Sequence, residues 1–266
     1  MMKHWTVVLL LIVTILSCKQ HENGGSKPDP LKLEILNQLK KSVQLYPDSA
    51  SMRMLYVNAL DSLQMYPQAI SQIDSMIKRD SLNNGLWFAK GQLSESNRDT
   101  VQAIGSYTNA LAIYPSVEAQ LSLANLFAET KNIAALRICQ NISRMGLGRE
   151  TDANCDFIAG VYYARTGNND KANAFFDRAI NNNYTLMEAY MEKGFIFYGS
   201  KKYTDAQKIF ETAITINNTY ADAYYWKAKI FEAMGNSDQA LLNYERSLGL
   251  DKNLKEARAA IKRLSK

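Results

Sequence analysis

The most constraining feature of this sequence is an internal period of 34 residues. Ala172, Ala206 and Ala240 follow this spacing, and each of them begins a short apolar segment of the same pattern. A period of this length indicates a chain built from copies of one supersecondary unit, each of which buries its apolar face against its neighbours. The matching segments are AISQIDSMI from Ala69, AIGSYTNAL from Ala103, ANAFFDRAI from Ala172, AQKIFETAI from Ala206 and ALLNYERSL from Ala240.

A second set of small residues follows the same register, with one local irregularity. One residue is lost after Pro115, two are gained in the Gly146–Asp152 loop, and Leu136 fills the alanine position of the copy between them. The irregularity is therefore local. The second set comprises Val57, Gly91, Ala124, Gly160, Gly194 and Ala228.

The pattern predicts that each copy forms two helices that pack against each other. In the first helix a large, a small and an aromatic residue are three or four positions apart, which places them on one helical face. In the second helix an aromatic residue follows the alanine by four positions, as Phe176, Phe210 and Tyr244 do. The small residue lets the second helix approach closely, and Gly167 and Gly235 stand where a first helix must end.

A 34-residue pair of antiparallel helices with this pattern resembles the tetratricopeptide repeat (TPR). The resemblance implies an all-α solenoid of about six helix pairs, wound as a right-handed superhelix, with capping helices at its ends. The first and third copies depart from the family pattern, with Arg53, Gln120 and Gln140 where large apolar residues are usual. We expect an extra helix in 31–49, a capping helix in 255–266, and repeats that fill 50–254 as 50–83, 84–116, 117–152, 153–186, 187–220 and 221–254.

The N-terminus predicts export and a lipid anchor. Lys3 precedes an apolar run at 6–16, which is shorter than the roughly 20 residues that a membrane-spanning helix needs. The sequence ILSC at 15–18 resembles the bacterial lipobox, which implies removal of residues 1–17 as a signal peptide and attachment of acyl chains such as palmitate to Cys18. An ordinary signal peptide followed by an unmodified cysteine is the alternative.

The residues that follow the lipobox bear on location. Lys19 stands where some bacterial lipoproteins carry the aspartate that retains them in the inner membrane. The resemblance therefore implies the outer membrane of a Gram-negative cell envelope. Residues 18–30 are polar and rich in Gly and Pro, which predicts a flexible tether between the lipid and the repeats.

The repeats offer no candidate site for catalysis, a metal or a cofactor. The chain has only two histidines, His4 in the predicted signal peptide and His21 in the predicted tether. No nucleophile–histidine arrangement and no histidine-ligated metal site can therefore form on the repeats. The net charge of +5 is spread along the chain without a basic cluster, which argues against nucleic acid. We predict a non-enzymatic protein without a cofactor, although catalysis by a lone carboxylate is left open.

Cys139 and Cys155 lie on helices that we expect to be neighbours. Cys139 precedes the end of its helix by roughly two turns, whereas Cys155 begins the next helix. Their Cα atoms are then further apart than the ~7 Å that a disulfide tolerates, so we expect two buried free thiols.

Five tripeptides of Asp, Ser or Thr and an apolar residue resemble a sequence that some bacteria O-glycosylate in exported proteins. Helix starts need the same residue types, and this second explanation is the one that we favour. The tripeptides begin at Asp48, Asp61, Asp74, Asp80 and Asp99.

The resemblance also implies where a partner binds, because in TPR proteins the outward positions of the first helices line a concave groove. Half or more of the corresponding side chains here are large and apolar, and Phe157, Val161, Phe195 and Tyr198 form the favoured cluster. The carboxylate clamp of some TPR domains is absent, since its positions hold Met54, Asn58, Leu121 and Asn125. The candidate groove residues are Phe88, Leu121, Phe157, Val161, Met191, Phe195, Tyr198 and Tyr225.

An apolar groove suits an amphipathic helix or an extended apolar segment of another protein. The sequence therefore predicts a membrane-anchored scaffold or adaptor for envelope proteins, similar in layout to lipoproteins that serve pilus assembly and outer-membrane protein insertion. The alternative is an envelope lipoprotein that binds glycans by stacking them on Trp87, Phe88, Tyr225 and Trp226.

Overall fold

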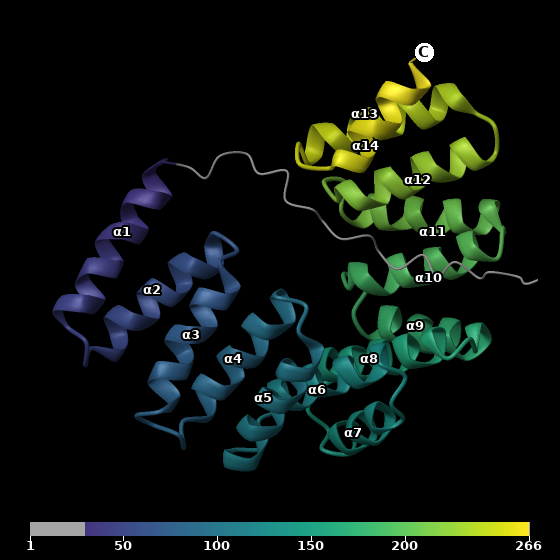
Figure 1. Cartoon of the computed structure of the whole chain (residues 1–266). Helices are drawn as coiled ribbons and strands as arrows, with labels where there is room; N and C mark the ends of the chain where they lie inside the picture. Colours follow the sequence, from purple (N-terminus) through teal and green to yellow (C-terminus); the bar gives the residue numbers. More distant parts are fainter. Residues whose placement is uncertain (1–29, 266) are drawn as a thin grey trace, which may run out of the picture. The chain divides into compact units, whose positions relative to one another are not determined.

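The computed structural model describes residues 30–265, in which every regular element is an α-helix (Figure 1). The predicted signal peptide, Cys18 and nearly all of the tether lie outside the described residues. The helices are α1 (Pro30–Leu45), α2 (Ala50–Ser62), α3 (Tyr66–Ile77), α4 (Asn84–Ser96), α5 (Thr100–Ile113), α6 (Val117–Glu129), α7 (Ala134–Ser143), α8 (Arg149–Arg165), α9 (Asn169–Asn182), α10 (Met187–Gly199), α11 (Tyr203–Ile216), α12 (Ala221–Ala233), α13 (Ser237–Leu250) and α14 (Lys255–Leu264).

The described helices form two compact units, divided between Gln64 and Met65. In the first unit α1 packs against α2. In the second unit, α3 to α14, each helix packs against the next along the chain, and the pairs α4–α5, α8–α9, α10–α11 and α12–α13 are the most closely associated. This arrangement confirms the predicted all-α fold of consecutive helix pairs.

Close approach within a pair depends on a small residue that faces a ring. A Cβ atom added to Gly91, Gly160 or Gly194 would lie within 3.0 Å of the ring carbons of Tyr107, Phe176 or Phe210, respectively. All three rings are fully buried. The predicted role of the small residue is therefore confirmed, and the ring fills the space that a larger side chain would occupy.

The turn between the two helices of a pair uses left-handed backbone. Gly167 and Gly235 have φ angles of 85° and 78°, which confirms that each stands at the end of a first helix. The equivalent turns after α4, α6 and α10 place Arg98, Lys131 and Lys201 at φ angles of 58–61°. A side chain in this region costs roughly 1–2 kcal/mol, so packing of the two helices must hold the turn in place.

Repeat three differs from the expected register by one residue. Ala135 is fully buried, whereas Leu136, the residue predicted at the alanine position, is only half-buried. Cys139 and Ile142, four and seven positions after Ala135, are buried as well, and Gln140 is exposed. Cys139 thus takes the place that an aromatic ring takes in the better-matching repeats.

The extra residues of this region lengthen a helix and are not in a loop. α8 has 17 residues, whereas α4, α6, α10 and α12 have 13 each. α8 begins at Arg149, so the repeat boundary expected between 152 and 153 falls inside it, and the predicted Gly146–Asp152 loop ends at Gly148. The boundary is displaced because α8 is about one turn longer at its N-terminal end than the other first helices.

Two of the five Asp-Ser/Thr tripeptides begin helices. Ser49 Oγ accepts a hydrogen bond from the backbone N–H of Met52, and Asp99 Oδ1 accepts one from that of Gln102. Both contacts cap a helix, as the favoured explanation requires. The explanation is wrong for the tripeptides at Asp61 and Asp74, which lie at the end of α2 and inside α3.

None of the helices between residues 30 and 265 combines the length and the apolar character needed to cross a bilayer.

Candidate protein-interaction surface

Two of the predicted groove residues are core residues. Val161 is 0% exposed and packs in one cluster with residues of α6 and α10, including Ala124 and Ala189. Met191 is 5% exposed and lies in a cluster with Ala223 of α12. The prediction that these two side chains line a groove is wrong, because the first helices of the neighbouring repeats cover them.

Three other candidates are half-buried, and their rings rest on the buried ring of the paired helix. The ring centroids of Phe88 and Tyr107 are 5.5 Å apart, those of Phe157 and Phe176 5.9 Å, and those of Phe195 and Phe210 6.1 Å. Leu121 is also half-buried, against the core cluster that contains Phe176. These side chains stabilise the repeats, so Phe157, Val161, Phe195 and Tyr198 do not form one exposed apolar patch.

The remaining two candidates, Tyr198 of α10 and Tyr225 of α12, meet around Trp226. Ring centroids of Tyr198 and Trp226 are 5.4 Å apart, edge to face, and those of Tyr225 and Trp226 are 5.9 Å apart. Trp226 also contacts Phe195 at 4.6 Å. Burial raises the pKa of both tyrosines, so their hydroxyl groups stay protonated at neutral pH. We call Tyr198, Tyr225 and Trp226 the aromatic cluster.

A cleft of about 540 Å³ lies beside the aromatic cluster, among the last helices of the chain. Rings line it from α10, α12 and α13, and α14 contributes the small side chains of Ala259 and Ala260. Tyr244 is buried, whereas Tyr198 and Tyr225 are half-buried and keep some exposed surface beside these short side chains. The lining residues are Tyr198, Tyr225, Lys229, Glu232, Ala233, Tyr244, Glu256, Ala259, Ala260 and Arg263.

A polar network fixes the wall of this cleft. Arg263 of α14 donates two hydrogen bonds, of 2.6 and 3.0 Å, to the carboxylate of Glu232 on α12. The Tyr244 hydroxyl donates a third, of 2.8 Å. The hydrogen bonds from Arg263, more than any other interaction, hold the pKa of Glu232 below its ordinary value, although partial burial opposes this. The network joins three helices and keeps Glu232 ionised.

Sequence patterns did not single out Glu232, Tyr244 and Arg263 as site residues. Glu232 and Arg263 are 31 positions apart and come together only when α14 packs on the last repeat. One feature of the sequence could have indicated this site. Glu232 follows Lys229 by one helical turn on the same first helix, so both side chains lie on one face of it.

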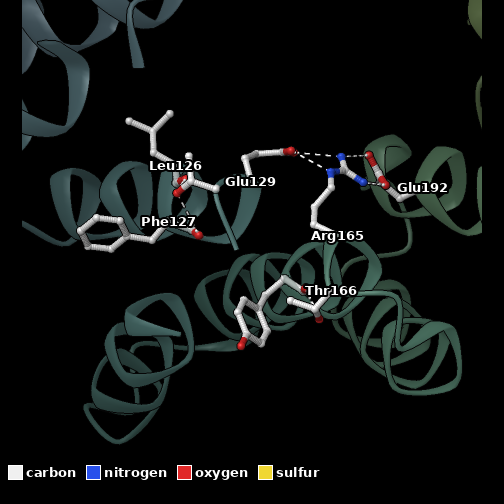
Figure 2. A network of polar contacts seen from close by, with 8 residues as sticks. Leu126, Phe127, Glu129, Arg165, Thr166 and Glu192 are labelled. Carbon is white, nitrogen blue, oxygen red and sulfur yellow. Dashed lines mark hydrogen bonds and ion pairs between the residues drawn. The ribbon is translucent and has the colours of Figure 1, made fainter. Parts of the chain in front are cut away.

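A second polar network links three first helices in the middle of the chain (Figure 2). Arg165 of α8 donates hydrogen bonds of 2.7 and 2.9 Å to Glu129 of α6 and two of 2.8 Å to Glu192 of α10. Figure 2 shows its guanidinium between the two carboxylates. The hydrogen bonds that Arg165 donates to Glu192 raise the pKa of Arg165 further, so it is permanently charged. The network has a structural role, because the two carboxylates already occupy the N–H donors of the guanidinium on both of its sides.

Cys139 and Cys155 are buried free thiols, as predicted. They are nevertheless neighbours in one core cluster, and the interaction with Cys155, together with burial, raises the pKa of Cys139. The shift in the register of repeat three accounts for this, because it brings Cys139 onto the face of α7 that meets α8.

The described residues show no grouping of three or more His, Cys, Asp or Glu side chains that could hold a metal ion. The four residues of the glycan hypothesis lie on two separate helices, Trp87 and Phe88 on α4 and Tyr225 and Trp226 on α12. Figure 1 shows these helices apart within the second unit. A glycan would therefore have to stack on two separate surfaces.

Comparison with known proteins supports the repeat pattern. The family model of the tetratricopeptide repeat matches residues 197–264, which contain the cleft of α10 to α14. No curated protein sequence matches the chain significantly.

Solved structures share the fold over most of the chain. A tetratricopeptide repeat protein from Parabacteroides merdae has a TM-score of 0.71 at 16% identity, over 88% of this chain and 93% of that one. PilW, described as a widely conserved type IV pilus biogenesis factor, has a TM-score of 0.59 at 17% identity, over 90% and 100%. Yeast Tom70 has a TM-score of 0.59 at 14% identity, over 88% and 58%. The family match identifies residues 197–264 as tetratricopeptide repeats, and the likeness to the solved structures shows that the fold of such repeats extends over most of the chain.

Proposed function

We propose that the protein is a membrane-anchored adaptor that binds an apolar segment of another cell-envelope protein in the cleft beside the aromatic cluster. The TPR fold suggests protein–protein interaction in general. The observation that carries the specific proposal is the cleft of about 540 Å³, whose lining combines three tyrosine rings and three alanines with four charged side chains.

The shape and lining of the cleft support an apolar ligand. Tyr198, Tyr225 and Trp226 are only half-buried, so their rings retain surface that a partner can cover. Burial of apolar surface contributes about 25 cal/mol per Å², and aromatic side chains offer much area at little cost in conformational entropy. An amphipathic helix or an extended segment fits a cleft between helices.

The lipobox-like sequence before Cys18 supports the anchor, and Lys19 supports the outer membrane of a Gram-negative envelope. A permanently anchored adaptor would hold its partner at the membrane surface. The fold that this chain shares with a pilus biogenesis factor is compatible with such a role, although the shared fold does not define the partner.

The test is site-specific photocrosslinking in intact cells. A photoreactive amino acid replaces Tyr225, which lines the cleft, or Tyr184, which is 68% exposed in the turn before α10. We expect one discrete crosslinked protein from position 225 and none from position 184. Equal crosslinking from both positions, or from position 184 alone, would show that the cleft is not the binding surface.

A further inference from the structure

One cation in the cleft, the ammonium of Lys229, makes no direct contact with a carboxylate of the described residues. The ammonium of Lys229 lies 4.9 Å from the ring centroid of Trp226, 5.8 Å from that of Tyr198 and 5.9 Å from that of Tyr225. Lys229 is half-buried and forms no ion pair with any described residue. Aromatic faces attract a cation but do not neutralise it, so N–H groups of the ammonium remain available to an anion.

The other charges of the cleft are compensated. Glu232 and Arg263 neutralise each other through two hydrogen bonds. Glu256 is exposed in the first turn of α14, where water and the helix N-terminus stabilise a negative charge. Lys229 lies within α12, away from both ends of that helix. The charge of Lys229 helps to lower the pKa of Glu232, but within the described part of the chain its ammonium contacts no carboxylate directly and is free to bind one.

We infer that the cleft recognises an internal Asp or Glu side chain of the partner segment, whose carboxylate binds Lys229 while its apolar neighbours cover Tyr198 and Tyr225. This inference rests on the proposed function and specifies the chemistry of the partner. A half-buried site strengthens a charge-assisted hydrogen bond relative to water. Arg263 is already paired with Glu232, so Lys229 is the cation of the cleft that can bind a partner's carboxylate. One cation suits a partner segment with a single carboxylate between apolar side chains.

The experiment uses the purified full-length chain and two fluorescent peptides. Both peptides are amphipathic helices with amidated C-termini, and they differ only at one central residue, Glu or Gln, between two leucines. Fluorescence anisotropy should show that the Glu peptide binds about tenfold more tightly. Lys229→Met should remove this preference, and Lys229→Arg should retain it. Lys227→Met is the matched control, because Lys227 lies on the same helix but pairs with Glu211 outside the cleft.

Glu256→Gln provides an independent check, because loss of a nearby negative charge should tighten binding of the Glu peptide and leave the Gln peptide unaffected. Circular dichroism and melting verify that each variant is folded.

The outcomes separate the inference from the proposed function. Equal binding of both peptides overturns the inference and leaves the apolar cleft intact, whereas no binding of either peptide contradicts both. Equal loss of the preference in Lys229→Met and Lys227→Met would indicate a general basic surface and overturns the inference. A preference that requires a free C-terminus would assign the site to a chain-terminal carboxylate, which also overturns it.

Discussion

The guanidinium of Arg165 and the carboxylate of Glu192 share two hydrogen bonds of 2.8 Å across the boundary between two repeats. With the bonds to Glu129 on its other side, Arg165 joins α6, α8 and α10. It does so beside repeat three, whose second helix carries Cys139 in place of a ring. Electrostatic bonds thus reinforce a part of the array that lacks this aromatic contact.

Arg165→Met should therefore lower the free energy of unfolding by about 1–2 kcal/mol, after allowance for the partial exposure of the pairs. The loss should be smaller in high salt, since salt screens the pairs that are removed. Urea denaturation of both proteins at two salt concentrations measures it. Arg137→Met, which removes an exposed arginine of α7, should have no measurable effect. An identical loss of unfolding free energy in both variants would show that the Arg165 network does not specifically stabilise the protein.

Gly194→Ala should lower the free energy of unfolding by roughly 1–2 kcal/mol, because the added methyl group overlaps the ring of Phe210. Repeat six has Ala228 at the same position, so a small shift can accommodate part of the overlap. Gly199→Ala is the control, because an added Cβ there contacts nothing within 4 Å. If the two variants melt at the same temperature, the close approach of α10 and α11 is not limited by this contact.

Phe157→Ser and Phe195→Ser together should lower the melting temperature markedly. Each ring packs against a buried ring of the paired helix, and removal of a half-buried phenylalanine costs about 2–4 kcal/mol. Thermal melting by circular dichroism gives the answer. Tyr184→Ser, at an exposed position, should melt like the wild-type protein. An unchanged melting temperature for the double variant would show that the two rings do not stabilise the repeats and are available to a partner.

Glu232 should make stability sensitive to acid. Its pKa is lowered in the folded state, mainly by hydrogen bonds from Arg263, against an ordinary value of about 4.5. A lowered carboxyl pKa contributes its full stability above that ordinary value and loses it as the pH falls through the folded pKa. We expect the melting temperature to fall below about pH 4.5, and Glu232→Gln to flatten this part of the profile.

Asp156 should change the stability in acid in the direction opposite to Glu232. Burial raises its pKa despite the ion pair with Arg178, so folding favours its protonated form, and its contribution to stability improves as the pH falls. In the Asp156→Asn variant the melting temperature should therefore fall more steeply with decreasing pH than in the wild-type protein. Profiles of Glu232→Gln and Asp156→Asn that both match the wild type would show that neither carboxyl governs acid stability.

Cys18→Ser should move the protein from the membrane fraction to the soluble fraction, because the lipobox-like sequence predicts that Cys18 carries the acyl chains. Fractionation of cells followed by a high-salt wash measures the distribution. Cys139→Ser is the matched control, because its thiol is buried in the repeats, and it should stay with the membranes. Retention of Cys18→Ser after the wash would contradict the lipoprotein prediction.

The helix pairs were predictable because the period and the alternation of small and large residues act within one repeat. Gly160 and Phe176, or Gly194 and Phe210, define a contact whose two partners belong to the same 34-residue unit. The register of repeat three was not predictable in the same way. Ala135 and Leu136 are adjacent and both apolar, and the choice between them depends on the turn at Lys131 and on the extra turn of α8.

The burial of the groove residues depends on contacts between repeats, which the pattern of one repeat does not contain. Val161 and Met191 occupy outward positions of their own helix pairs, but the adjacent first helices lie over them. The cleft depends on α14, whose alanines and Arg263 meet α12 only in the folded chain. Tyr198 and Tyr225 were predicted in the same way, from the outward side of their first helices, and both remain half-buried beside the cleft.

The thiol in place of a ring at Cys139 has a mechanical consequence. In a repeat array each layer is held only by its own packing and by its two neighbours, so resistance to stretching is set by the weakest layer. α7 is a short helix of 10 residues and lacks the buried aromatic ring that α5, α9, α11 and α13 carry. When the chain is pulled by a bound partner, we expect α7 to detach first, while the Arg165 network keeps α6 joined to α8 and α10.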